Sequence, residues 1–530
     1  AAMYVPLSPL EFRTRAERIF GGKVGVIDGD RRFTYAEFGE RSRRLAAALR
    51  RLGVKPGEVV SFITYNTHHL LEAYYGVLQA GAVLNPINIR LNPQEIAYIL
   101  NHAESRVLCF HKDFVPMVHA MREGLQTVRN FVVLEPDLAL PFAAHEYETL
   151  LRGAPPQADD PTVDENEAAE LFYTSGTTGK PKGVVLTHRS LYLHALYATI
   201  SLRQADATVL LHVVPMFHVN GWGSPHTITA SGGTHVMLRK IDPLEIFRLI
   251  QAERVTVVLG VPTIYNALVN HPDIGKYDLS SLRVAVTGGA PASSVLVKAM
   301  EEKLGCEAFV GYGLTETSPV LTLARPKAHL ASESPDQQRE RRSKTGYQVL
   351  GVNIRVVDTQ GRDVPADGTT VGEIVARSNV VMDGYHKDPQ ATAEAIRDGW
   401  FHTGDMASID AEGYALIVDR KKDIIISGGE NISSVEVENT LFSHPAVFEV
   451  AVIGVPDDQW GEVPKALVVL KPGAQATGDE LIHFCRDRLA HFKAPKSVEV
   501  LESLPKGGTG KILKGELRER YWKGLAKRVH

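Results

Sequence analysis

Apolar and polar positions along this chain repeat in a rhythm of short buried strands and amphipathic helices. Residues 59–63 form an apolar run typical of a buried strand, and a helix is predicted from about residue 67 to 79. Thr34-Tyr-Ala-Glu37 is a capping box, in which a hydroxyl and a carboxylate satisfy each other's backbone N–H groups. Asn92-Pro-Gln-Glu95 opens another helix with proline at its first position.

The same rhythm continues to about residue 286. Further strands are predicted at residues 107–110, 131–134, 209–214, 255–260 and 282–286. Strands that alternate with helices favour parallel sheets covered by helices on both faces. We therefore expect an α/β fold, with a large N-terminal domain built on two doubly wound sheets.

The pattern changes twice toward the C-terminus. From about residue 346 to 417, short strands and Gly/Asp turns predict a small β-barrel-like subdomain, and the polar stretch 331–344 before it is expected to be an exposed excursion. After Arg420, segments at 434–442, 447–455, 465–470 and 479–489 read as helix, strand, strand and helix. We expect domains at 1–419 and 420–530, the second a small mobile α+β unit.

Composition narrows the class of protein only moderately. The chain has 530 residues, 44% of them hydrophobic and 23% charged, which is ordinary for a globular protein. A net charge of -4 leaves no electrostatic footprint for nucleic acid. The three cysteines lie far apart, so they favour a reducing, cytoplasmic setting, and no apolar run of about 18 residues predicts a membrane span.

The densest candidate chemistry lies in Tyr173-Thr-Ser-Gly-Thr-Thr-Gly-Lys-Pro-Lys-Gly183. Glycines allow the backbone N–H groups of such a loop to point at one anion, while hydroxyls and lysines add donors and positive charge. The loop is not a Walker A motif, because Pro181 follows Gly179-Lys180. By itself it is as typical of a flexible connector as of a polyphosphate site.

Further motifs follow predicted strands, where doubly wound sheets place their ligands. They are Gly288-Gly-Ala-Pro291, Tyr312-Gly-Leu-Thr-Glu-Thr317, Thr403-Gly-Asp405, Asp419-Arg-Lys-Lys-Asp423 and Lys506-Gly-Gly-Thr-Gly-Lys511. In this order, with the glycine loop, they resemble the adenylate-forming superfamily, and most closely its fatty acyl-CoA synthetases among the AMP-dependent acid–CoA ligases. The resemblance extends from the helix at Thr34 to Lys511.

The resemblance implies a ligase that works in two steps. A carboxylic acid and ATP give acyl-AMP and pyrophosphate, and coenzyme A then gives acyl-CoA and AMP. ATP, Mg²⁺ and coenzyme A are the implied cofactors and co-substrates. A short- or medium-chain fatty acid is the first expectation for the acid, with long-chain acids also open, and a homodimer is compatible because dimers are common among the fatty acyl relatives.

The resemblance also implies roles at individual positions. The β- and γ-phosphates fall to Thr174, Ser175, Gly176, Thr177, Thr178, Gly179 and Lys182. The adenine falls to Gly289, Ala290, Pro291, Tyr312 and Gly313, the α-phosphate to Thr315, Mg²⁺ to Glu316, and the ribose to Asp405 and Arg420. Lys511, on a glycine tip, is the implied catalytic cation that bridges carboxylate and α-phosphate.

The remaining implied roles concern domain movement and the acid. Lys422 is the implied hinge, and Gly428, Gly429 and Glu430 line the coenzyme A passage after rotation. The acyl pocket is expected to contain His218, Trp222, Val261, Thr263, Gly288 and Val320. His218 is interpreted as a positioning group near the carboxylate rather than a metal ligand, since no second ligand stands three or four residues away.

Several alternatives remain open from the sequence. The acid could be another small one, such as 3-methylthiopropionate or an aryl acid. An adenylation enzyme that loads a carrier protein, or a luciferase-like oxidative enzyme, would share the first half-reaction. A non-catalytic acyl or nucleotide binder is a different class, which intact Glu316, Asp405 and Lys511 disfavour.

Overall fold

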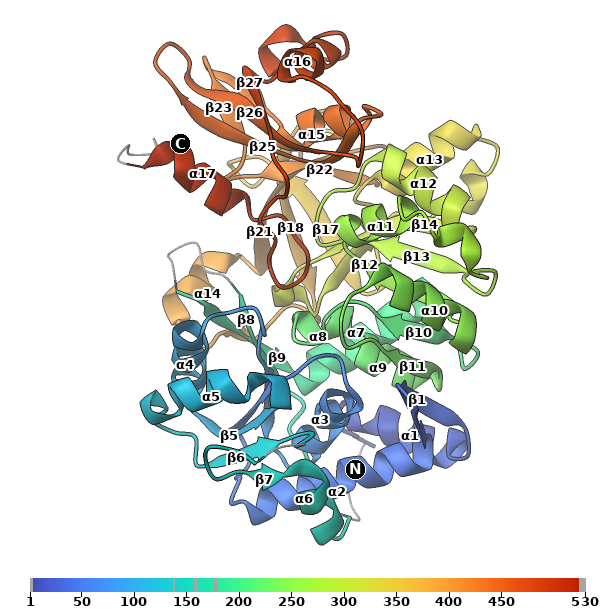
Figure 1. Cartoon of the computed structure of the whole chain (residues 1–530), viewed down its shortest axis with the longest axis vertical. Helices are drawn as coiled ribbons and strands as arrows, with labels where there is room; N and C mark the ends of the chain where they lie inside the picture. Colours follow the sequence, from blue (N-terminus) through green and yellow to red (C-terminus); the bar gives the residue numbers. More distant parts are fainter. Residues whose placement is uncertain (1–2, 137–138, 157–160, 175–179, 524–530) are drawn as a thin grey trace.

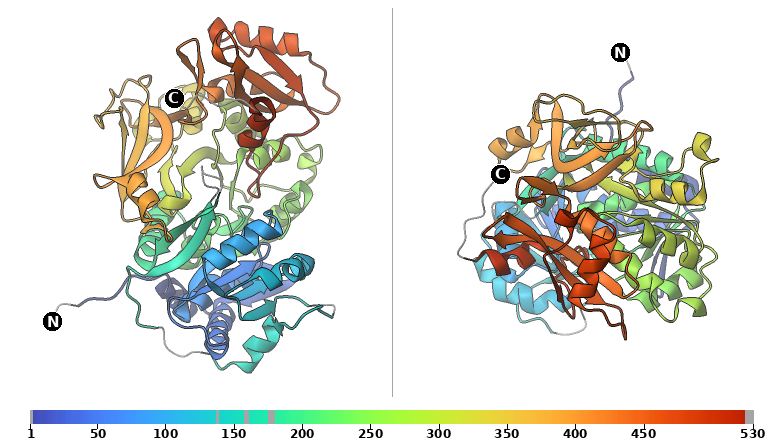
Figure 2. Two further views of the ribbon diagram at one scale, coloured as in Figure 1. Left: turned by 90° about the vertical axis from the view of Figure 1, so that its left-hand side faces the viewer. Right: turned by 90° about the horizontal axis from the view of Figure 1, so that it is seen from above.

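The computed structural model describes residues 3–136, 139–156, 161–174 and 180–523. A large N-terminal domain forms most of the molecule, and a small C-terminal domain caps one end of it (Figure 1). The two further views show the same division, with the C-terminal domain resting on the side where the β-rich subdomain and the second large sheet meet (Figure 2). The expected α/β class with a large and a small domain is confirmed.

The first large sheet has eight strands within the described part of the chain, in the order β19-β9-β8-β4-β3-β5-β6-β7. Pairing is parallel from β8 to β7, and β9 and β19 add antiparallel edges. Its strands are β3 (Val59–Ile63), β4 (Val83–Pro86), β5 (Ser105–Phe110), β6 (Asn130–Val133), β7 (His145–Glu146), β8 (Ala168–Thr174), β9 (Lys182–Thr187) and β19 (Gly384–Tyr385).

The second large sheet has nine strands among the described residues, in the order β16-β15-β14-β13-β12-β10-β11-β1-β2. The run from β1 to β14 is parallel, and its two ends are antiparallel. Its strands are β1 (Val24–Asp28), β2 (Arg31–Thr34), β10 (Val209–His212), β11 (Thr234–Met237), β12 (Val257–Gly260), β13 (Val284–Thr287), β14 (Glu307–Gly313), β15 (Val320–Leu323) and β16 (Tyr347–Gln348).

Helices cover both sheets, as the alternating pattern predicts. The predicted capping box of Thr34 with Glu37 is present, and at the predicted helix start at Asn92 the structure shows a second one with Glu95. Helix α3 is buried along its whole length because it contacts both β4 of one sheet and β1 of the other. The helices are α1 (Leu10–Phe20), α2 (Tyr35–Arg51), α3 (His68–Gln79), α4 (Pro93–His102), α5 (Val115–Met121), α6 (Tyr147–Gly153), α7 (His188–Leu202), α8 (Val219–Trp222), α9 (Ser224–Ser231), α10 (Pro243–Glu253), α11 (Pro262–Val269) and α12 (Ser294–Leu304).

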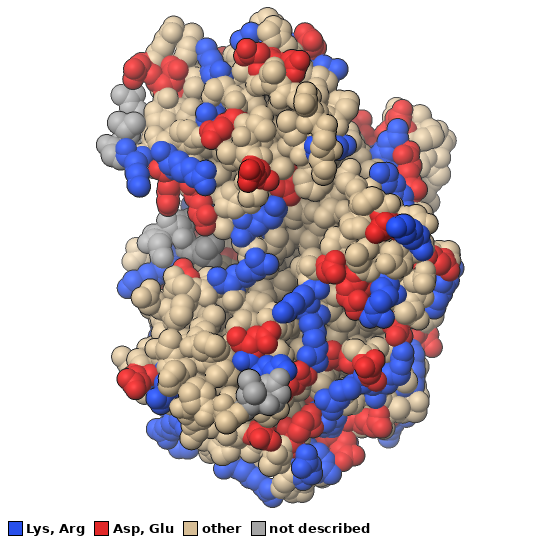
Figure 3. All heavy atoms as spheres, in the orientation of Figure 1, with Lys and Arg blue, Asp and Glu red and all other residues tan. Residues whose placement is uncertain are grey.

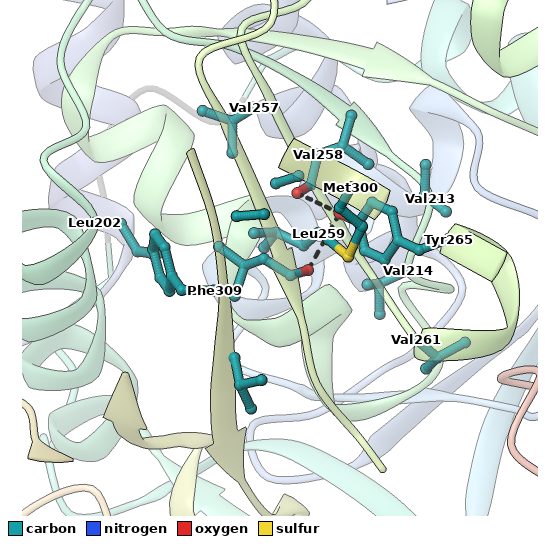
Figure 4. Close-up of a cluster of buried hydrophobic side chains, with 14 of the residues drawn as sticks. Leu202, Val213, Val214, Val257, Val258, Leu259, Val261, Tyr265, Met300 and Phe309 are labelled. Carbon is teal, nitrogen blue, oxygen red and sulfur yellow. Dashed lines mark hydrogen bonds between the residues drawn. The ribbon is translucent and has the colours of Figure 1, made fainter. Parts of the chain in front are cut away.

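The core of the second sheet fixes the strand ends that carry the candidate motifs. Tyr265 of α11 is fully buried, and its hydroxyl donates to the backbone oxygens of Val258, at 2.8 Å, and Val286, at 3.2 Å (Figure 4). A buried phenol with both bonds made is stabilising rather than costly. It ties the helix after β12 to β12 and β13, so the loops after these strands leave from a rigid base.

The β-rich subdomain is an antiparallel sheet, with β17 (Val352–Val357), β18 (Gly372–Ser378), β20 (Ile396–Arg397), β21 (Trp400–Ile409) and β22 (Ala415–Arg420), and helix α14 (Pro389–Ala395) beside it. Strands β16 and β19 come from the same stretch of sequence but join the two large sheets. The polar segment 331–344 before it has no buried residue, in agreement with the exposed excursion that was expected. It contains helix α13 (Pro335–Ser343), which is held by an ion pair of 2.6 Å between Arg342 and Glu301 of α12.

The C-terminal domain has its own apolar core and a three-stranded sheet in the order β25-β26-β27. The predicted helix, two strands and helix after Arg420 are all present. Its elements are β23 (Ile425–Ser427), β24 (Glu430–Ile432), α15 (Ser434–Phe442), β25 (Val447–Asp457), β26 (Gly461–Leu470), α16 (Gly478–Arg486), β27 (Ser497–Val500) and α17 (Lys514–Trp522).

The surface shows no field of one sign on the face in Figure 3, where basic and acidic side chains are interspersed. This agrees with the net charge of -4. A helix with the length and hydropathy needed to cross a bilayer is not found among the described residues.

Candidate active site

The loop before α17 leaves the C-terminal domain and reaches the ends of β12 and α11 in the N-terminal domain (Figure 1). Its tip is anchored by Thr263, whose Oγ1 donates to the backbone oxygen of Gly510 at 2.7 Å. Gly510 has φ +85°, and a Cβ there would lie 3.2 Å from both Thr263 and Val261. Glycine therefore serves both the left-handed backbone and the close approach of the tip.

Lys511 follows this anchor directly and is close enough to Arg420, Asp405 and His218 to interact with them electrostatically. Solvent reaches its side chain, yet the surrounding protein, and then the guanidinium of Arg420, lower its pKa to about 8. Both properties are expected in a narrow crevice, where water is present but too scarce to solvate an ammonium fully. Burial, with a smaller contribution from the Lys511 charge, lowers the pKa of His218 to about 4.

A second cluster joins Tyr312, Asp405 and Arg420 across three strands. The hydroxyl of Tyr312 donates to Oδ2 of Asp405 at 2.6 Å, and Nε of Arg420 contacts Oδ1 at 2.8 Å. Asp405 and Arg420 face each other in the β21–β22 register. Asp405 is only 3% exposed, whereas 41% of the Arg420 side chain is exposed, so the pair presents its cationic end to the crevice.

A third cluster gathers where β9, β19 and the end of β14 meet. Glu316 lies in the short 3-10 turn Thr315–Thr317, and its Oε1 accepts a hydrogen bond of 2.9 Å from the hydroxyl of Tyr385. Nζ of Lys182 lies 5.0 Å from the centre of the Tyr385 ring. Thr174 and Lys182 are paired at the loop end of the β8–β9 hairpin. The expected phosphate residues Ser175, Gly176, Thr177, Thr178 and Gly179 lie outside the described residues.

Sequence reasoning did not single out Tyr385. It belongs to a two-residue strand, whose pairing with β9 brings it beside Glu316 although it lies 69 positions away. Its only local signal is an aromatic residue in an otherwise polar stretch, and that signal does not indicate a partner.

Three of the expected acyl-pocket residues, Trp222, Val261 and Gly288, lie close together around Gly289. A Cβ on Gly288 would lie 2.6 Å from the backbone oxygen of Gly311 and 3.4 Å from the Trp222 indole. A Cβ on Gly289, which has φ +77°, would lie 3.3 Å from Val261 and 3.5 Å from the same indole. Ala290 and Pro291 continue this turn. The indole therefore packs flat against backbone that has no side chains.

Gly288 is a direct test of this packing. We expect Gly288→Ala to destabilise the protein by about 1–3 kcal/mol, because the new methyl group collides with backbone that cannot move away. Gly275→Ala is the matched control, since no atom lies within 4 Å of the position that its Cβ would take. Denaturant unfolding measures both, and equal stability of the two variants would contradict the close approach at Gly288.

The candidate coenzyme A residues are not part of this crevice. Gly428 and Gly429 form the turn between β23 and β24, and the N–H of Gly428 donates to the backbone oxygen of Trp460 at 3.0 Å. Glu430 begins β24. Strand β23 stands well apart from the loop that carries Lys511 (Figure 1). Lys422 lies in the turn after β22, where the N–H of Asp423 donates to the oxygen of Arg420 at 2.8 Å.

The chain matches two family models in succession. Residues 12–386 match the model of the AMP-binding enzyme, and residues 436–511 match that of the AMP-binding enzyme C-terminal domain. The chain belongs to the AMP-binding enzyme family. The expected resemblance is confirmed, and the boundary between the two matches falls in the stretch that holds Arg420 and Lys422.

The activity of this chain follows from its similarity to relatives in this family. The chain is 42% identical to a long-chain-fatty-acid–CoA ligase of Thermus thermophilus, over 96% of this chain and 95% of the relative. It is 38% identical to a peroxisomal butyrate–CoA ligase of Arabidopsis thaliana, over 97% and 93%. This AMP-binding enzyme is thus an acid–CoA ligase that uses ATP and forms AMP.

The solved structure of one relative has the same overall arrangement of the two domains. The anthranilate CoA ligase in complex with anthranoyl-AMP superposes with a TM-score of 0.91 at 27% identity, over 98% of both chains. Such a score requires the large and small domains to superpose together. This AMP-binding enzyme therefore shares the overall arrangement of its two domains with that relative.

Proposed function

We propose that this ligase activates a short- or medium-chain fatty acid and transfers the acyl group to coenzyme A. The observation that carries the proposal is the position of Lys511, which is close enough to His218 and to the Asp405–Arg420 pair for its charge to interact with these groups. A cation there faces the point at which a carboxylate meets the α-phosphate of ATP. Two anions must approach each other in that step, so positioning and positive charge are the main catalytic requirements.

The nucleotide is assigned to the groups that line the crevice. Thr174 and Lys182 take the β- and γ-phosphates, together with the loop between them. The turn Gly289–Ala290–Pro291, the ring of Tyr312 and Gly313 take the adenine. Asp405 takes the ribose hydroxyls, since its buried carboxylate is already oriented by Tyr312 and Arg420.

Thr315 and Glu316 complete the site at the phosphates. Glu316 suits Mg²⁺ because it offers a hard carboxylate oxygen beyond the one bond to Tyr385, and Mg²⁺ usually takes one or two carboxylates plus phosphate oxygens. When bound, the ion supplies charge neutralisation at the phosphates. Tyr385 holds the Glu316 carboxylate in place, and Thr315 donates to the α-phosphate.

The acid pocket favours an apolar acid without a second charge. Its assigned wall is made by Trp222, Val261, Val320 and Gly288, with Thr263 at the rim and neutral His218 near the carboxylate. None of these side chains carries a positive charge that would recruit a second carboxylate. The two named relatives act on long-chain fatty acids and butyrate. Sequence identity therefore does not fix the chain length of the acid, which is inferred from the residues of the pocket wall.

The decisive assay measures pyrophosphate release across acetate, butyrate, hexanoate, octanoate, palmitate, 3-methylthiopropionate and benzoate, with and without coenzyme A. We expect release and thioester formation to peak at four to eight carbons, roughly the span of a small pocket. Release without thioester would instead indicate a carrier-loading enzyme. No release with any acid would contradict the proposal.

We also propose how the second half-reaction is reached. The boundary between the domains is placed at residues 419–420, and Lys422 is the hinge about which residues 420–530 rotate. Rotation would withdraw Lys511 and bring Gly428, Gly429 and Glu430 to line the coenzyme A passage. A homodimer is a separate proposal, tested by sedimentation velocity of the full chain.

The pKa of Lys511 sets a pH dependence for adenylation. The ammonium is the active form, and its pKa in the free enzyme is lowered to about 8. Because kcat/KM follows ionisation of the free enzyme, kcat/KM for acyl-AMP formation should fall as the pH rises through about 8. Lys511→Arg keeps its charge above pH 12, so any residual activity should lose this alkaline limb. The same limb in both proteins would assign it to another group.

A further inference from the structure

The turn that carries Trp222 has a strained backbone. Five successive residues have positive φ: Val219 at +29°, Asn220 at +43°, Gly221 at +56°, Trp222 at +58° and Gly223 at +85°. Glycine adopts such values readily, whereas β-branched and bulky residues rarely do. Only two of the five are glycines, so the surrounding structure must hold this turn in place.

The buried carboxylate of Glu170 hydrogen-bonds to this turn. Glu170 lies in the middle of β8 and is 0% exposed. Its Oε2 accepts a hydrogen bond of 3.0 Å from Nδ2 of Asn220, and its Oε1 lies 2.5 Å from Nε2 of His226 in α9. The carboxylate therefore ties both the strained turn and the helix that follows it to the first large sheet. Charge-assisted bonds of this kind are the strong ones in a buried setting.

The opposite side of the turn is closed by His194 of α7. A Cβ on Gly223 would lie 2.6 Å from the imidazole of His194, so the ring is in direct contact with the turn. Nε2 of the same ring accepts the N–H of Val320 at 3.1 Å. Between Glu170 and His194 the turn has little freedom to move, and the indole of Trp222 is pressed against Gly288 and Gly289.

We propose that Glu170 is a positioning residue for the choice of acid. Through Asn220 and His226 it keeps the turn 219–223 in its left-handed form and so fixes Trp222 as the wall that limits the acyl pocket. Glu170 itself does not touch the acid. The inference rests on the proposed function, in which Trp222 lines that pocket.

The strand that contains Glu170 contributes to the assigned sites of both ATP and the acid. Strand β8 carries Glu170 in its middle and Thr174, the assigned phosphate residue, at its end. The strand that presents the phosphate loop is thus the strand that holds the acid wall. Separating the two effects requires an assay that reports on ATP and on the acid independently.

The experiment compares three variants in acid-dependent pyrophosphate release. Asn220→Gly removes the bond to Glu170 and leaves glycine at a left-handed position, so folding is preserved while the turn is loosened. Glu170→Ala removes the anchor itself. Glu72→Ala is the matched control, since Glu72 is 1% exposed and binds Arg41 and Tyr147, away from the turn.

The quantity compared is kcat/KM for an acid two carbons longer, divided by kcat/KM for the preferred acid. In Asn220→Gly and Glu170→Ala we expect this ratio to rise roughly tenfold, because excluding one methylene from a pocket is worth at least that factor. KM for ATP should change less than about twofold. Glu72→Ala should lose stability and keep the wild-type ratio. If Glu170→Ala does not fold, Asn220→Gly decides the question.

Two results would overturn the inference. One is an unchanged ratio in folded Asn220→Gly, and the other is the same change of ratio in Glu72→Ala. A wild-type protein that releases no pyrophosphate with any acid would overturn the proposed function instead, and the inference with it. Each failure is thus assigned to its own cause.

Discussion

Lys511→Ala should lose acyl-AMP formation by roughly 10²–10³-fold while largely keeping thioester formation from supplied acyl-AMP. On the proposed function the Lys511 ammonium stands where the two anions meet, and the hydrogen bond between Thr263 and Gly510 anchors the loop that carries it. No other side chain on this tip supplies that charge, because the preceding residues are glycine and threonine. Once acyl-AMP exists, the two anions are joined and the charge is no longer required.

The two half-reactions are measured separately, by pyrophosphate release with acid and ATP and by thioester formation from synthetic acyl-AMP. Lys421→Ala is the control, since this exposed neighbour of the hinge leaves the crevice intact. Equal loss of both half-reactions in Lys511→Ala would contradict the role assigned to Lys511 in adenylation. It would indicate a general disturbance of the domain interface.

Lys422→Pro should slow the thioester step by about 10²-fold and adenylation much less. On the proposed function the present arrangement is the adenylation state, so fixing φ at residue 422 should favour that state and hinder the rotation to the other. Lys422→Ala separates the backbone from the side chain, because it removes the side chain and leaves φ free. An unchanged ratio of the two partial rates in Lys422→Pro would place the hinge elsewhere.

The local elements of this fold were predictable because their causes are local. The capping boxes at Thr34 and Asn92 bind groups three residues apart, and the apolar run 59–63 marks a strand regardless of its neighbours. The βαβ rhythm indicated parallel sheets for a similar reason, since a right-handed crossover is the usual way to return to the same sheet. The nature of the ligand was also legible, because motif chemistry is contained in short segments.

Segment 331–344 shows where this reasoning stops. It was expected to be exposed and none of its residues is buried, but its sequence does not reveal that the arginines of α13 bind acids such as Glu301, which lie about forty positions away. A charged helix face looks the same in sequence whether it meets water or a complementary partner. Tyr385 was missed for the same reason, since its partner Glu316 is reached only through the pairing of β19 with β9.

The sequence by itself determined the fold class, the family and the chemistry that the chain performs, because propensity, capping and motif order depend on neighbouring residues. Only the tertiary structure decided the state of each group in the site. The lowered pKa of Lys511 comes from burial by the surrounding protein and from the charge of Arg420, and the left-handed turn at Trp222 is hydrogen-bonded through Asn220 to Glu170, 50 residues before it. Burial, field and strain are properties of what surrounds a residue, and those surroundings exist only in the folded chain.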